Sequence, residues 1–209
     1  MKRGFFAAAP ELVAPRLLGK LLVRRTKTGI LAGRIVEVEA YLGPHNQPPD
    51  PAAHSHRGLT PRNAVLFGLA GHAYVYAIYG RYFCMNISCE REGLAGCVLL
   101  RALEPVEGLE QMARNRGVAA DAPARMIASG PSRLCQALEI TRPMHNGLDL
   151  LDPDSPLQVR DDGAAAGEVA VTARIGLSVA LDLPMRFCVA GHKCVSGPRT
   201  LSLPRPSLG

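Results

Sequence analysis

Two glutamates separated by a single residue, Glu37 and Glu39, interrupt an apolar run that ends in an aromatic residue. Alternate side chains of an extended strand point to the same face, so the glutamates should share one face with Ile35 and Tyr41. Paired carboxylates beside an aromatic ring are typical of general acid/base chemistry, and a solvated outer strand face would show the same alternation. The strand by itself leaves both interpretations open.

All five tyrosines lie between Tyr41 and Tyr82, and the chain contains no tryptophan. His54 lies in the same stretch, so aromatic faces, polar edges and carboxylates are concentrated in one region. This combination predicts a pocket for a flat heteroaromatic ring. Tyr79 is followed by Gly80 at a predicted hairpin tip, where a side chain has little core to enter. We expect it to insert into a partner, as wedge residues do in the DNA minor groove.

His54 and His56 stand in a long loop, residues 43–63, that is rich in Pro, Gly, Asn and Asp. Two histidines with Glu37 or Glu39 could bind a metal ion, so a metal-dependent hydrolase is one alternative. A second alternative is a non-catalytic nucleic-acid-binding module that uses the tyrosines only for stacking. Activity in the presence of a chelator would exclude the hydrolase, and release of a base would exclude the binding module.

Hydrophobic periodicity and turn residues predict the elements that must position these groups. Strands are expected at 21–25, 30–41, 72–79, 82–88, 96–103, 169–175 and 186–190, helices at 11–18, 107–116 and 129–138, and a surface loop at 117–128. The predicted fold class is α+β, a single compact domain with an antiparallel or mixed sheet surrounded by short helices. We expect this domain to cover residues 1–197 and a loose tail to cover 198–209.

The charge distribution favours a nucleic-acid partner. Residues 1–105 hold 13 Lys and Arg against 7 Asp and Glu, whereas residues 106–209 hold 11 of each, so the whole excess of +6 lies in the half with the tyrosines. No apolar stretch approaches the roughly 20 residues that span a bilayer, and Glu11 interrupts the apolar start too early for a signal peptide. Six cysteines without a C-x-x-C pair predict buried, reduced thiols in a cytoplasmic protein with no membrane contact.

These residues lie in blocks that resemble the alkyladenine (3-methyladenine) DNA glycosylase family. In chain order, the blocks are Arg34–Pro44, His54, Thr60–Asn63, Tyr74–Gly80, Cys84–Asn86, Val98–Pro105 and Ser129–Leu138, with a weaker match at Arg186-Phe187. The resemblance extends from about residue 10 to about residue 195 and keeps the blocks in order.

The resemblance implies a monofunctional DNA repair enzyme that flips an alkylated, or deaminated, purine out of duplex DNA. The enzyme would then hydrolyse the N-glycosidic bond and leave an abasic site. By position, Glu39 would be the general base that activates the attacking water, with Glu37 in a supporting role. Arg101 would hold that water or a neighbouring phosphate.

The resemblance also implies a base pocket in which Tyr41 and His54 stack on opposite sides of the flipped purine. Tyr76 would close its edge, and Asn86 would form a floor that crowds the exocyclic amine of normal guanine. Tyr79 would be the wedge that fills the gap in the DNA. No metal and no cofactor are expected. The expected partner is double-stranded DNA with a damaged purine, bound by a monomer.

Two departures from the family pattern bear on these expectations. Arg81 follows the wedge motif where the family commonly has methionine, which puts a second intercalating contact in doubt and favours a phosphate contact instead. The loop from Gly43 to His54 contains Pro48-Pro49 and is longer than usual, which would alter the edge of the pocket.

Overall fold

The longest strand, β2 (Gly29–Tyr41), organises the fold because it pairs with three other strands. The computed structural model describes residues 1–198. The first half of β2 forms a hairpin with β1 (Leu21–Thr26), and its last residues pair with β8 (Arg186–Val189). Its other edge pairs with β5 (Gly96–Glu107) along nearly its whole length. Residues near the end of β2 are therefore hydrogen-bonded on both sides.

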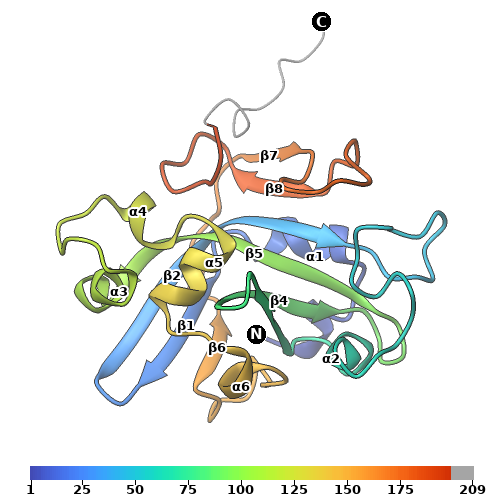
Figure 1. The fold of residues 1–209 in the computed structure, drawn as a ribbon, viewed down its shortest axis with the longest axis horizontal. Coiled ribbons are helices and arrows are strands. Elements are labelled where there is room, and N and C mark those ends of the chain that lie inside the picture. Colours follow the sequence, from blue (N-terminus) through green and yellow to red (C-terminus); the bar gives the residue numbers. More distant parts are fainter. Residues whose placement is uncertain (199–209) are drawn as a thin grey trace, which may run out of the picture.

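The remaining strands extend this sheet at its edges (Figure 1). The order is β3-β4-β5-β2-β1-β6, where β3 is Ala73–Ile78, β4 is Tyr82–Cys89 and β6 is Leu157–Arg160. Strand β7 (Val169–Thr172) pairs only with β8. Every pairing is antiparallel, which confirms the predicted α+β fold with an antiparallel sheet.

Short helices surround this sheet. They are α1 (Pro10–Leu17), α2 (Ala64–Phe67), α3 (Leu109–Arg116), α4 (Ala124–Ala128), α5 (Pro131–Ala137) and α6 (Arg142–His145), after a 3-10 turn at Arg3–Phe5. The prediction of a loop over residues 117–128 is wrong in part, because α4 occupies its end. Helices of four or five residues span little more than one turn and show no hydrophobic period, so the sequence pattern misses them.

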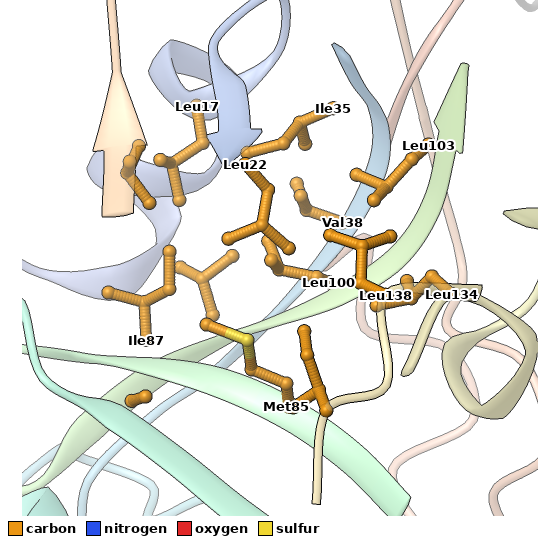
Figure 2. Packing of buried hydrophobic residues seen from close by; sticks show 14 of the residues in the cluster. Leu17, Leu22, Ile35, Val38, Met85, Ile87, Leu100, Leu103, Leu134 and Leu138 are labelled. Carbon is orange, nitrogen blue, oxygen red and sulfur yellow. The ribbon is translucent and has the colours of Figure 1, made fainter. Parts of the chain in front are cut away.

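The main core lies between the sheet and the helices α1 and α5. Figure 2 shows Leu17 of α1 and Leu134 of α5 on two sides of strand residues such as Leu22 and Leu100, all with no solvent exposure. Burying a leucine side chain stabilises the fold by about 1.5–3 kcal/mol. This packing fixes β2, β4 and β5, the strands that carry most of the predicted site residues.

The alternation predicted for β2 breaks at a double register shift. Across β2 and β5 the partners are Ile35 with Leu103, Glu37 with Ala102, and Val38 with Leu100. Val36 and Arg101 are thus left without a partner in this register. Such a bulge reverses which face the next residues occupy. Ile35 packs in the main core with Val38, so the prediction that Ile35 shares a face with the glutamates is wrong.

The prediction of buried cysteines outside disulfides is confirmed, since all six thiols are free and buried. Among residues 1–198, none of the helices has the length and apolar composition needed to cross a membrane. The predicted tail, residues 198–209, falls outside the described residues except for its first position.

Gly43 is the first residue of the long loop 43–63, and a substitution there tests how closely this loop packs on the sheet. A Cβ atom at Gly43 would overlap with the carbonyl oxygen of Ala95 and lie 2.6 Å from the ring of His45. Overpacking costs about 3 kcal/mol, so we expect Gly43→Ala to lower the melting temperature by roughly 5–10 °C. Gly4→Ala is the matched control, because its added Cβ meets no atom within 4 Å. Equal melting temperatures for both variants would show that the loop shifts freely.

Candidate active site

A pocket lies between the C-terminal end of β2 and the β3–β4 hairpin. Its empty volume, including the open mouth, is about 390 Å³. Its lining residues are Tyr41, Ala52, His54, Tyr74, Tyr76, Asn86, Cys97 and Leu177. All four residues that the sequence assigns to a base pocket are among them. They come from β2, the long loop, β3 and β4, so only the folded chain brings them together.

The hairpin explains why two tyrosines face the pocket. Tyr74 and Tyr76 alternate along β3, and their rings stack with centroids 5.6 Å apart and an interplanar angle of 28°. The ring of His54 meets Tyr76 edge-on, with centroids 4.5 Å apart. His54 Nδ1 lies 3.0 Å from the Tyr74 hydroxyl, which orients the imidazole.

His54 stands at the pocket mouth with part of its ring open to solvent. Contact with the tyrosines removes water from the other part of the ring, and Arg62 adds a positive charge nearby. Both effects lower the pKa of His54 below its ordinary value, so the ring is neutral at neutral pH. A neutral imidazole offers a flat stacking face without adding a positive charge to the pocket.

Asn86 and Cys97 form the inner end of the pocket. The Cys97 thiol donates to the Asn86 side-chain oxygen over 3.5 Å, and both residues are buried. Burial raises the pKa of Cys97 to about 12, so the thiol keeps its proton and remains a donor. The Asn86 amide is thereby held in one orientation at the pocket wall.

Glu39 lies directly behind the pocket, fully buried and held by three donors. The Tyr41 hydroxyl donates to Oε2 over 2.9 Å, and the Ile175 amide donates to Oε1 over 2.8 Å. Arg101 Nη1 lies 3.2 Å from the same Oε1. A carboxylate has about four lone-pair sites, so one acceptor position on Oε2 stays free. Burial and the charge of Glu39 raise the pKa of Tyr41, which keeps its hydroxyl protonated as a donor.

Glu37 has a different environment, because its carboxylate contacts two arginines and both donor groups of Ser196. Arg186 Nε lies 2.7 Å and Arg101 Nε 3.1 Å from Oε1. The Ser196 amide donates to Oε2 over 2.6 Å and its hydroxyl to Oε1 over 2.9 Å. Glu37 thus ties β2 to β5, β8 and the segment that follows β8, and this environment suits a structural role.

Arg101 joins the two glutamates. Burial acts to lower the pKa of Arg101, but the charges of Glu39 and Glu37 raise it overall, so the guanidinium stays charged. Its position follows from the register shift on β5. At this shift Arg101 has no partner residue on β2, and its carbonyl accepts a hydrogen bond from the Gly130 amide over 2.8 Å.

Tyr79 projects from the tip of the β3–β4 hairpin and is 90% exposed. Its φ of +48° is a left-handed conformation that costs a non-glycine residue of order 1–3 kcal/mol. Exposure and strain together are the opposite of what a core tyrosine would show. Arg81 folds back over the ring of Tyr82, with its guanidinium carbon 4.7 Å from the centroid.

The ligands of the alternative metal site are not brought together. His54 is directed at Tyr74, and Glu37 at two arginines and Ser196. Across residues 1–198, no three His, Cys, Asp or Glu side chains are grouped closely enough to hold a metal ion. The residues of the alternative metal site therefore have other partners in this structure.

Comparison with known proteins agrees with this geometry. The family model for methylpurine-DNA glycosylase (MPG) matches residues 4–193. The chain belongs to the methylpurine-DNA glycosylase family.

Three relatives of this glycosylase each carry the name "Putative 3-methyladenine DNA glycosylase". A protein of Koribacter versatilis (strain Ellin345) is 53% identical over 201 residues, which cover 96% of this chain and 95% of the relative. One of Rhodopseudomonas palustris (strain BisB18) is 48% identical over 95% of this chain and 91% of its own length. A protein of Methanoculleus marisnigri is 48% identical over 92% of this chain and 96% of its own length.

Several residues of the candidate site were not predicted from the sequence. The predicted strand 169–175 ends at Thr172, because the chain then turns towards Glu39 and brings Ile175 and Leu177 to the site. Arg186 was matched only weakly, and nothing in the spacing indicated Arg174. Their partners lie more than 100 residues away in the chain, beyond the reach of local patterns.

Glu37→Gln tests the structural role of this carboxylate in the glycosylase. The change removes the buried carboxylate that Arg101 and Arg186 share, and breaking a buried ion pair costs about 3–5 kcal/mol. We expect the melting temperature to fall by roughly 10 °C or more. Glu104→Gln is the control, because Glu104 pairs with Lys193 near the surface, where such a pair contributes at most about 1 kcal/mol. Equal, small shifts would contradict the role of Glu37.

Proposed function

We propose that this chain is a monofunctional DNA glycosylase that flips an alkylated purine out of duplex DNA and hydrolyses its N-glycosidic bond. The proposal depends above all on one observation. A fully buried carboxylate, Glu39, is oriented by three donors directly behind an aromatic pocket and keeps one acceptor position free. A binding module that only stacks bases would have no use for such a carboxylate.

The pocket suits a flat, electron-poor ring. Tyr41 and the neutral His54 would stack on the two faces of the flipped purine, and Tyr76 would contact its edge. A methylated purine carries a positive charge, which strengthens its attraction to aromatic faces. The oriented amide of Asn86 would disfavour normal guanine through its exocyclic amine. A deaminated purine fits the same pocket, but an uncharged base also needs protonation to leave.

In the chemical step, the free position of Glu39 accepts a proton from a water molecule. The water oxygen bonds to the sugar C1′ carbon while the C1′–N bond breaks. The bonding electrons go to the purine, which neutralises the positive charge of a methylated base. Arg101 lies within ion-pair distance of both buried carboxylates and would also contact the water or an adjacent phosphate. The products are a free base and an abasic site.

The surface around the pocket mouth suits a DNA backbone. Arg57, Arg62 and Arg142 are exposed and line hollows beside His54 and Tyr76. Within residues 1–198, none of these three arginines forms an ion pair with a carboxylate. Exposed guanidinium groups without a carboxylate partner are good ligands for phosphates. The exposed Tyr79 would then enter the duplex as the wedge. A monomeric state and a cytoplasmic location remain predictions.

Glu39→Gln tests the general base. The amide keeps the shape of the side chain but cannot take the proton of the water, and loss of a general base costs on the order of 100-fold or more. We expect single-turnover release of a methylated base to fall by at least this factor, while binding to the lesion duplex changes little. Glu92→Gln, at an exposed position, is the control. A near-normal rate for Glu39→Gln would remove Glu39 from this role.

Tyr79→Ser tests the wedge. Serine cannot fill the gap that a flipped nucleotide leaves, so the flipped state should become less populated. We expect a larger loss of activity on a lesion in a stable base pair than on the same lesion in a mismatch or a single strand. The melting temperature should not fall, because Tyr79 is exposed and strained. A lower melting temperature with equal losses on all substrates would instead assign Tyr79 to packing.

A further inference from the structure

Two segments more than 100 residues apart both line the pocket, and a single buried ion pair joins them. Loop 43–63 contributes Ala52 and His54, and the segment after β7 contributes Leu177. The pair consists of Asp50 from the loop and Arg174 from the segment, and neither side chain has any solvent exposure.

The pair is bidentate and has further anchors. Arg174 Nη1 lies 2.5 Å from Asp50 Oδ2, and Nη2 lies 2.9 Å from Oδ1. Arg174 Nη1 also donates to the Ala40 carbonyl over 3.0 Å. The two carboxylate oxygens accept from the amides of Leu42 and Ala52 over 3.2 and 3.0 Å. The guanidinium is therefore fixed both to β2 and to the loop.

This fixed guanidinium covers one face of a pocket residue. Its carbon lies 4.5 Å from the ring centroid of Tyr41, whose hydroxyl donates to Glu39. The next residue in the chain, Ile175, donates its amide to the same carboxylate. The ring of Tyr41 is thus held by its hydroxyl and by one face, which leaves the other face for a ligand.

We propose that Arg174 is a positioning residue of the base pocket, which, anchored by Asp50, sets the plane of the Tyr41 ring against which a flipped purine stacks. The inference rests on the proposed function and adds a residue that does not itself touch the base. Only a planar, two-pronged group can pair with Asp50 through two nitrogens and keep its central carbon over the ring at once. A lysine keeps the charge beside Asp50 but loses the flat contact.

Arg174→Lys is the main test, and Asp50→Asn is the second variant. Near-UV circular dichroism reports on the tyrosines, since the chain has no tryptophan. We expect both variants to lose near-UV signal while the far-UV spectrum stays unchanged. In single-turnover assays on a methylated duplex, the half-saturating enzyme concentration should rise by about 10-fold, as for a lost stacking face, and by more than the maximal rate falls.

Two controls separate positioning from stability. Leu157→Ala creates a cavity in β6, at the end of the sheet opposite to β3, and loses stability without touching the pocket. Arg34→Lys alters another bidentate pair, with Asp162, outside the pocket. Neither should change the near-UV signal at temperatures where the protein is folded, nor raise the half-saturating concentration.

An unchanged near-UV spectrum for Arg174→Lys and Asp50→Asn would overturn the inference, as would losses no larger than those of Leu157→Ala. If the wild-type protein releases no base, the proposed function fails, and the near-UV spectra still decide whether Arg174 positions Tyr41. The two failures are therefore distinguishable.

Discussion

The site depends on the burial of two carboxylates on one strand, two residues apart. Each would be strongly destabilising in an apolar interior without partners, because an unpaired buried charge costs several kcal/mol. Arg101 contacts both, and Arg186 contacts Glu37. The arginines come from β5 and β8, the two strands that flank the end of β2. The sheet order therefore decides whether the carboxylates can be buried at all.

The two glutamates divide the available donors unequally, and their roles follow from this division. Glu37 contacts two guanidinium groups and accepts from the amide and the hydroxyl of Ser196, which makes it a link between strands. Glu39 receives one guanidinium, one amide and the hydroxyl of Tyr41. It therefore keeps an acceptor position and is coupled directly to the pocket wall. In the proposed function, the chemical step and base recognition would meet at this hydrogen bond between Tyr41 and Glu39.

The sequence predicts β2, β3 and β4 well, because β2 is a long apolar run and a clear turn separates β3 from β4. It also predicts that Tyr41, His54, Tyr76 and Asn86 belong together, although only through a family resemblance. Local patterns fail where the structure departs from regular alternation or relies on distant contacts. The double register shift places Ile35 on the opposite face from the one that the alternation predicts. The contacts of Arg174 with Asp50 and of Ile175 with Glu39 leave no periodic signal in the chain.

The most direct test of this account is the reaction of the wild-type protein with a duplex that contains a single methylated purine, in the presence of a strong chelator. The account predicts release of the free base at an undiminished rate, with the DNA strand intact until alkali cleaves the abasic site. Absence of free base, loss of release with the chelator, or direct cleavage of the strand would contradict a metal-independent, monofunctional glycosylase.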